Sequence, residues 1–440
     1  MGEFKIKTEY NFGSSRSTNS PKAWSSLMYL TERERGAAYK NDSVMARYYK
    51  YIALRKIWDP QSTAVEEGHG AVFNIEFSPN GSLLVAACER ASFLVFDPVS
   101  QQLIKSKRKA HSDCVNCVRF LDSRSFLTCS DDKTICLWDA RNLKSNVFSL
   151  VGHTSWVKSI EYCRESGKLV TSAFDDTIRT WDLNRYMESG NPRGKVLLNV
   201  SNLTRMKLTP CGGKMIISSI PGHLVVIHNL DLDFLEKHMD EHTLPFWSFP
   251  GNQPGMSIPN QNKPWTAKNK FEVIAEFPDN VIPWCISSLE IHPQGWCVVS
   301  RYSSAGWNQE WTAVYDIQTS HLKDSGLEPV NQDGASTTPE RLIYCIEEPN
   351  VARGYIKEPC FSCDGRTIGS PFGNTSRLLG FSSECEELPK CLLKNPSELL
   401  DLKILVSHKN PVLTCRFSPT HPTLATGCLG GKVSFHFPKL

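Results

Sequence analysis

Long apolar runs are missing from this 440-residue sequence, and so is an excess of charge of either sign. No stretch reaches the roughly eighteen apolar residues that a membrane-spanning helix requires, so no membrane partner is expected. The 49 lysines and arginines nearly balance the 46 aspartates and glutamates, which gives a net charge of +3. Proteins that bind nucleic acid through its phosphates carry a clear basic excess, so nucleic acid is not expected as a partner either.

Signals for export and for catalysis are also scarce. The first fifteen residues, MGEFKIKTEYNFGSS, contain no apolar signal-peptide core, so the sixteen cysteines are expected to be reduced thiols in the cytoplasm, the nucleus or both. No GxSxG nucleophile motif occurs, and the zinc-protease spacing of His238, Glu241 and His242 has no identifiable third ligand. The pairs Cys114–Cys117 and Cys360–Cys363 fall in expected strands, where their thiols point to opposite faces. The sequence therefore predicts no catalytic residue, no metal and no cofactor.

A repeat of 42 residues is the strongest positive signal. Gly68–His69 is followed by Ala110–His111 and then by Gly152–His153, and each dipeptide leads into a strand of alternating apolar residues such as VFNIEF. Alternation with a period of two, bounded by turn residues, indicates half-buried strands. A spacing of about 40–45 residues with several short strands per repeat is typical of WD-repeat blades.

Two of the repeats contain a complete set of hydrogen-bonding residues, and the threonine, aspartate and tryptophan have the same separations in both. The sets are His111, Thr128, Asp132 and Trp138 in one repeat, and His153, Thr171, Asp175 and Trp181 in the next. In such a tetrad the imidazole bonds to the carboxylate, and the hydroxyl and the indole N–H extend the network into the blade. A buried polar group left without a partner costs ~1–3 kcal/mol, so these residues are predicted to be structural and not catalytic.

Degenerate repeats continue to the end of the chain and bring the total to seven. The later ones begin with TRMKLTP, with CISSLEIHP, with GYIKEPCFS and at Ser407–His408. The predicted fold class is all-β: a seven-bladed WD-repeat β-propeller over residues 58–440, with an irregular insertion at about 233–278 between the fourth and fifth blades. Because the chain stops after a third strand, the missing outer strand of the last blade is expected from residues 58–67.

Residues 1–57 are expected to form a flexible N-terminus with a helical extension. A first amphipathic helix is predicted over residues 22–36 and a second from Ser43 to Trp58. The apolar face of the first helix is formed by Trp24, Leu27, Met28 and Leu30. A helix pair of this kind either packs against the side of its own propeller or docks into a groove on a partner, and the sequence leaves both alternatives open.

The second blade ends in Trp138-Asp139-Ala140-Arg141, with an arginine two residues after the WD dipeptide. This WDxR sequence resembles the box of the substrate receptors of cullin-four ubiquitin ligases. In the third blade the corresponding arginine comes one place late, since Asp182 is followed by Leu183, Asn184 and Arg185. Longer stretches, including GHGAVFNIEFSPNGS, IEEPNVARGYIKEPCFS and FSPTHPTLATGCLGGKVSFHFPKL, are also similar to a member of that receptor family.

The resemblance implies a non-catalytic substrate receptor. Its partners would be the damage-specific DNA-binding adaptor of the ligase, cullin-four and a RING subunit through that adaptor, and an unknown protein substrate. The residues that the resemblance assigns to the adaptor are Asp139, Arg141, Asp182, Arg185, Trp24, Leu27, Met28 and Leu30. The alternative function is a general WD-repeat protein-interaction scaffold with no link to ubiquitin, because a propeller binds proteins in many unrelated contexts.

Overall fold

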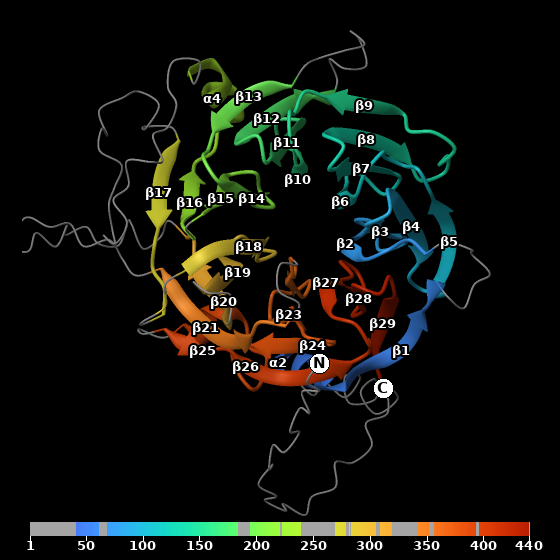
Figure 1. Ribbon diagram of the computed structural model, residues 1–440. Coiled ribbons are helices and arrows are strands. Elements are labelled where there is room, and N and C mark those ends of the chain that lie inside the picture. The colour runs from blue at the N-terminus through green and yellow to red at the C-terminus, as the bar shows by residue number, and fades with distance from the viewer. Residues whose placement is uncertain are drawn as a thin grey trace, which may run out of the picture. The chain divides into compact units, whose positions relative to one another are not determined.

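Seven β-sheets are arranged in a ring, and this confirms the predicted seven-bladed propeller (Figure 1). Residues of all seven blades line a central channel. The computed structural model describes residues 41–60, 68–183, 194–220, 222–238, 269–278, 281, 283–304, 309–318, 341–351, 356–392 and 396–439. The compact unit that holds the ring runs from Asn41 to Lys439. Among the described residues no helix is both long and apolar enough to cross a bilayer.

Blades 1 to 3 each consist of four consecutive antiparallel strands. These are β2 (Val72–Phe77), β3 (Leu84–Cys88), β4 (Ser92–Asp97) and β5 (Gln102–Lys107) in blade 1; β6 (Val115–Phe120), β7 (Ser125–Ser130), β8 (Thr134–Asp139) and β9 (Phe148–Val151) in blade 2; and β10 (Val157–Cys163), β11 (Lys168–Ala173), β12 (Thr177–Asp182) and β13 (Lys195–Asn199) in blade 3. The first strand of each blade lies nearest the channel (Figure 1).

Blades 4 to 6 are less regular. They contain β14 (Leu203–Leu208), β15 (Lys214–Ser219), β16 (Leu224–His228) and β17 (Lys270–Ile274) in blade 4; β18 (Pro283–Ile291), β19 (Cys297–Ser304), β20 (Gln309–Asp316) and β21 (Leu342–Pro349) in blade 5, joined by the parallel strand β25 (Ser397–Glu398); and β22 (Cys360–Phe361), β23 (Thr367–Phe372), β24 (Thr375–Gly380) and β26 (Leu400–Val406) in blade 6. Two short helices, α4 (Leu232–His238) and α6 (Leu388–Cys391), follow third strands.

The predicted position of the insertion was wrong by one strand. Because β17 pairs along its whole length with β16, it is the fourth strand of blade 4. The excursion therefore lies inside blade 4 and not between blades 4 and 5. Of the weak zinc-protease spacing, His238 is the last residue of α4, while Glu241 and His242 lie outside the described residues.

The ring is closed by a strand from the N-terminal side of the first repeat. Blade 7 contains β27 (Val412–Phe417), β28 (Leu424–Cys428) and β29 (Val433–Pro438), and its outer strand is β1 (Ile52–Trp58). The expectation that residues 58–67 close the ring was therefore wrong, and so was the prediction of helix up to Trp58. The propeller unit begins at Asn41, earlier than the predicted boundary at residue 58. Pairing with β29 from Ile52 to Trp58 satisfies backbone groups at the sheet edge, which outweighs a helical spacing of side chains.

The core is divided among the seven interfaces between neighbouring blades. Each interface holds one cluster of buried apolar side chains, contributed by the two sheets that face each other. At the closing interface, Trp58 of β1 and Phe435 of β29 pack edge-on against Phe96 of blade 1. Burial of apolar area at every interface stabilises the closed ring.

The second predicted helix packs against its own propeller. Helix α2 (Asn41–Tyr51) leads directly into β1, and its Ala46 and Tyr49 are buried in the cluster between blades 6 and 7. The Tyr49 hydroxyl donates to Asp364 Oδ1 at 2.6 Å, and the ring meets Phe417 edge-on. Of the two alternatives for this helix, the structure therefore shows the packed one. The first predicted helix, over residues 22–36, lies outside the described residues.

The two faces of the ring can be told apart by the direction of the strands. First and third strands of a blade end at the same face, which also carries the β22–β23 turn with Asp364, and we call it the α2 face. The opposite face carries the turns between second and third strands and the connections between blades. We call it the tetrad face, since the histidines and aspartates of the two predicted tetrads lie there.

Candidate functional site

The tetrad of blade 2 forms a continuous buried chain. His111 Nδ1 lies 3.0 Å from Asp132 Oδ2, and His111 Nε2 lies 2.7 Å from Thr128 Oγ1. Trp138 Nε1 donates to the same hydroxyl oxygen at 2.9 Å. Burial lowers the pKa of His111, but the bonds to Asp132 and the nearby Cys136 outweigh it and raise the pKa to about 9. All four side chains are occupied with one another, as a structural role requires.

Blade 3 repeats the same geometry. His153 Nδ1 lies 2.9 Å from Asp175 Oδ2, and its Nε2 lies 2.8 Å from Thr171 Oγ1. Trp181 Nε1 donates to Thr171 Oγ1 at 2.8 Å. Burial would raise the pKa of Asp175, but its hydrogen bonds with His153 and Thr177 hold it well below its usual range. The carboxylate is thus kept ionised for its structural bonds.

Blade 7 has a partial network at the equivalent positions. His408 Nε2 lies 2.8 Å from Thr426 Oγ1, and His436 stands where the other blades have tryptophan, with its Nε2 3.4 Å from the same hydroxyl. Burial lowers the pKa of His408 to about 4. The histidine is neutral there, unlike His111, because no carboxylate bonds to it among the described residues.

Charged side chains form a ring across the central channel, and the sequence analysis did not predict it. Six first strands each place one ionised side chain at the same level, and the signs alternate around the ring. In order, they are Glu76, Arg119, Glu161, Lys207, Glu290 and Arg416. We call this set the charge ring. The signal was present in the sequence, since each residue directly precedes a large aromatic or aliphatic residue at or next to the end of its strand, as in NIEF, CVRF and SIEY.

Every member of the charge ring pairs with both of its neighbours. Arg119 lies 3.4 Å from Glu76 and 2.9 Å from Glu161; Lys207 lies 3.4 Å from Glu161 and 3.2 Å from Glu290; and Arg416 lies 2.8 Å from Glu290 and 2.7 Å from Glu76. Burial would raise the pKa of Glu290, but Arg416 and Lys207 lower it to about 2. A partner is therefore expected to bind on one of the two faces and not to pass through the channel.

A second polar layer lies above the charge ring, toward the tetrad face. Glu358 of blade 6 reaches across the channel, where it accepts from Asn74 Nδ2 at 2.5 Å and pairs with Arg205 at 3.3 Å. Arg205 also donates to the Lys158 carbonyl at 2.9 Å. These bonds join blades 1, 3, 4 and 6 and further fill the channel.

On the α2 face, the turn after β8 presents Arg141. Asp139 accepts from the Arg124 guanidinium, with Nε at 2.9 Å, and its Oδ1 also accepts from the Arg141 backbone N–H at 3.0 Å. The Arg124 hydrogen bonds lower the pKa of Asp139 to about 2. The Arg141 side chain is exposed, and within the described part of the chain its guanidinium makes no hydrogen bond or ion pair. Asp139 therefore positions the turn, and Arg141 is the group left available to a partner.

The other residues that the resemblance assigned to the adaptor are placed only in part. Asp182 is the last residue of β12 and is partly buried, at the position that corresponds to Asp139 in blade 2. The remaining residues, Arg185, Trp24, Leu27, Met28 and Leu30, lie outside the described residues.

The Cys360 thiol of the second CxxC pair contacts Cys415 Sγ of blade 7, at 3.7 Å. Cys114 precedes β6 and Cys117 lies within it, while Cys360 begins β22 and Cys363 follows in the turn. Burial is the main cause that raises the pKa of both Cys114 and Cys363. All sixteen cysteines are described and free.

Comparison with known proteins places this geometry in a family. The model for the WD domain, G-beta repeat, matches residues 60–97, 102–139, 144–182 and 401–436. The DDB1- and CUL4-associated factor 10 of Xenopus laevis is 45% identical over 399 residues, which cover 84% of this chain and 85% of the relative. The chain belongs to the DDB1- and CUL4-associated factor 10 family.

The family extends across vertebrates. The Homo sapiens factor 10 is 43% identical over 403 residues, which cover 84% of this chain and 70% of the relative. A shorter match, 31% identical over 137 residues, is to a DDB1- and CUL4-associated factor 11 homolog of Caenorhabditis elegans, with 29% of this chain and 24% of the relative covered. The factor 10 matches confirm the resemblance that the WDxR box and the longer stretches indicated.

Proposed function

We propose that this chain is a non-catalytic substrate receptor. It docks on the adaptor that the relatives' names call DDB1, the damage-specific DNA-binding adaptor, and presents a protein target to a cullin-four RING ubiquitin ligase. The chemistry then belongs to other subunits, and this chain supplies position. It works in the cytoplasm, the nucleus or both, and it needs no cofactor or metal.

The observation that supports this proposal best is the exposed Arg141 guanidinium on the α2 face. The bonds of Asp139 to Arg124 and to the Arg141 N–H hold the turn in place, so little conformational entropy is lost when a partner carboxylate pairs with Arg141. Arginine held on a rigid element and buried by a partner is a common binding hot spot.

Helix α2 lies on the same face as Arg141. Tyr49 packs at the end of first strands, beside Phe417 and Asp364, and Arg141 follows the end of a third strand. A partner that covers this face can therefore contact both. The segment 22–36, which supplies Trp24, Leu27, Met28 and Leu30, precedes α2 in the sequence, and we propose that it and Arg185 also bind the adaptor.

The proposal is tested by co-purification of the full chain with the purified adaptor. Arg141→Ala is expected to weaken binding by ~2–4 kcal/mol, the range of a hot-spot arginine. Arg90→Ala is the matched control, since Arg90 is also exposed but lies in the turn between β3 and β4, on the opposite, tetrad face. Equal binding by the wild type and Arg141→Ala would remove Arg141 from the docking surface.

A deletion tests the N-terminal segment, and the structure fixes where it should end. Removal of residues 1–40 leaves α2 and β1 in place and is expected to weaken adaptor binding while the propeller stays folded. A deletion that extends past Ile52 also removes the closing strand β1, so a loss of adaptor binding could then come from unfolding of the propeller and not from loss of the docking segment. If the intact chain does not bind the adaptor at all, the chain is instead a general WD-repeat interaction scaffold.

A further inference from the structure

Blade 3 presents an exposed aromatic pair on the tetrad face. Trp156 directly precedes β10 and Phe174 directly follows β11, and the Phe174 N–H donates to the Trp156 carbonyl at 3.0 Å. The ring centroids are 6.1 Å apart, and the two residues are 48% and 45% exposed. Side chains this large are seldom left in water side by side unless something binds them.

The propeller fold itself does not require aromatic residues at these two positions. The same backbone hydrogen bond joins Asp131 to Cys114 in blade 2, at 3.1 Å, and Ile220 to Asn202 in blade 4, at 3.0 Å. Blade 1 has the equivalent bond between Glu89 and Ala71. Side chains that are not aromatic therefore suffice in the blades on either side, so the need for Trp156 and Phe174 lies outside the fold.

The partly buried ammonium group of Lys158 packs against both rings of the aromatic pair. Lys158 Nζ lies 5.0 Å from the centroid of Trp156 and 5.3 Å from that of Phe174, within the range of cation–π attraction. The same ammonium pairs with Asp131 Oδ1 at 2.8 Å and bonds to Asn116 Oδ1 at 3.2 Å. The rings are thus held in place before any partner arrives, which lowers the entropy lost on binding.

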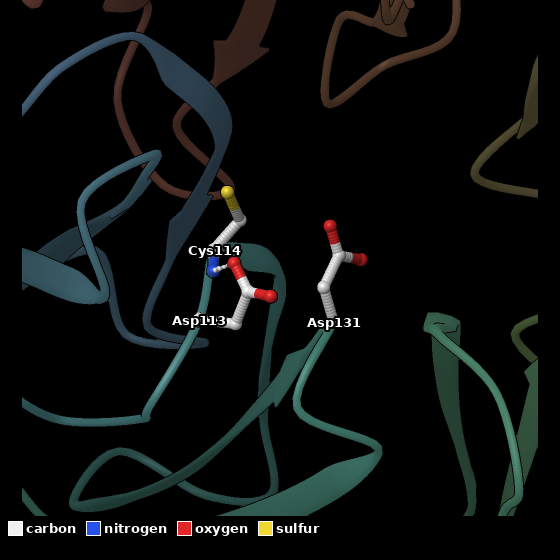
Figure 2. A group of neighbouring side chains, drawn as sticks. All are labelled: Asp113, Cys114 and Asp131. Carbon is white, nitrogen blue, oxygen red and sulfur yellow. Dashed lines mark hydrogen bonds between the residues drawn. The ribbon is translucent and has the colours of Figure 1, made fainter.

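Carboxylates lie beside the aromatic pair, in blade 2. Figure 2 shows Asp113, Cys114 and Asp131 grouped together, with the Asp113 carboxylate accepting from the Cys114 N–H at 2.7 Å. Ligand atoms of these three residues lie within 4.8 Å of one another. The Cys114 pKa is raised to about 11, by burial first and then by Asp113, Asp131 and Glu89, so the thiol is neutral. A metal ion would favour a thiolate, whereas a guanidinium needs only carboxylates at this spacing.

We propose that Trp156, Phe174 and the Asp113–Asp131 carboxylates form the surface that recognises the protein substrate, and that the occupant is an extended segment with an arginine next to an apolar residue. The guanidinium pairs with Asp113 and Asp131, and the apolar neighbour covers the exposed rings. Two carboxylates against the one ammonium of Lys158 give the surface a negative excess that favours a basic segment. This inference rests on the proposed function, because it assigns the substrate to the face opposite Arg141.

The probe is a library of random seven-residue peptides, selected for binding to the full-length protein. Enrichment of sequences with arginine beside Leu, Ile, Met or an aromatic residue is expected. Fluorescence anisotropy of an enriched peptide should show at least a tenfold loss of affinity for Trp156→Ala and for Asp113→Asn, and a marked weakening at high salt. Trp284→Ala is the matched control, since Trp284 is an equally exposed tryptophan (47%) in blade 5.

Three outcomes would overturn the inference: no enriched sequence, enrichment of acidic or uncharged sequences, or peptide binding that Trp156→Ala leaves unchanged. Adaptor co-purification with the same variants separates this inference from the proposed function. Trp156→Ala should retain the adaptor, and Arg141→Ala should retain the peptide. If the chain binds the arginine peptides through Trp156 but does not bind the adaptor, the ligase proposal is wrong and the inference about the peptide surface stands.

Discussion

The hydroxyl of Thr171 is the point at which the tetrad of blade 3 can be tested most cleanly. It is fully buried and joins His153 Nε2 and Trp181 Nε1, each at 2.8 Å. Thr171→Val keeps the shape of the side chain and removes only the hydroxyl. Two buried polar nitrogens then lose a partner, and at ~1–3 kcal/mol for each the expected destabilisation is about 2–6 kcal/mol.

Thr171→Ser provides the matched control, because it keeps the hydroxyl and removes a methyl group. Loss of one buried methyl costs about 1 kcal/mol, so Thr171→Ser should unfold close to the wild type. The assay is unfolding in urea, followed by tryptophan fluorescence and far-UV circular dichroism, with midpoints compared among the variants. Equal midpoints for Thr171→Val and Thr171→Ser would refute the view that the hydroxyl network stabilises the blade.

Blade 7 supplies an internal comparison. Thr426 bonds to His408 at 2.8 Å and has no indole partner, since His436 lies farther away at 3.4 Å. Thr426→Val therefore leaves about one close hydrogen-bonding group without a partner, whereas Thr171→Val leaves two. It should lower the free energy of unfolding by about half as much. A larger loss of stability in Thr426→Val than in Thr171→Val would contradict this reasoning.

Three further predictions concern the ring as a whole. The pKa of Glu290 is about 2 in the folded protein and about 4.5 in the unfolded chain, so its stabilisation is fully present above pH 4.5 and is lost as the pH falls toward 2. Thermal melts from pH 7 to 3 should show this loss as a falling melting temperature, and Glu290→Gln should make the melting temperature less dependent on pH. Arg416→Gln removes two ion pairs and should cost ~3–5 kcal/mol in urea unfolding, against less than ~0.5 kcal/mol for the exposed Arg164→Gln. Deletion of residues 1–58 should abolish the cooperative melt that deletion of 1–40 retains, since only the longer one removes β1.

The parts of the fold that repeat along the chain could be read from the sequence. The 42-residue spacing and the offsets of Thr128 and Thr171 depend on local strands and turns, so seven blades and two tetrads followed directly. The closing strand could not be read in this way. Ile52 continues the helical spacing of Tyr48, yet β1 is a strand because β29, almost 400 residues away in the chain, offers it an edge.

The candidate site was predictable to a smaller extent. The sequence predicts the turn that carries Arg141, because this residue comes shortly after Trp138 at the end of a strand. That Arg124 holds the turn through its hydrogen bond to Asp139 is visible only in the structure. Exposure of Trp156 and Phe174 was not visible in the sequence. WVKSIEY has the alternation of any half-buried strand, and whether its first aromatic faces a core or water depends on the neighbouring blades.

The charge ring carries a constraint that follows from counting. On a closed loop, strict alternation of two signs is possible only for an even number of members, and this propeller has seven blades. One blade must therefore contribute an uncharged residue or place like charges side by side. Blade 6 has Cys360 at the equivalent register position, paired with Gly369 as Arg416 is paired with Ala425, and the long Arg416 side chain spans the gap to Glu290 at 2.8 Å. Position 360 is thus where the alternation of charges is interrupted. An acidic residue there would lie beside Glu290, and a basic residue would lie beside Arg416.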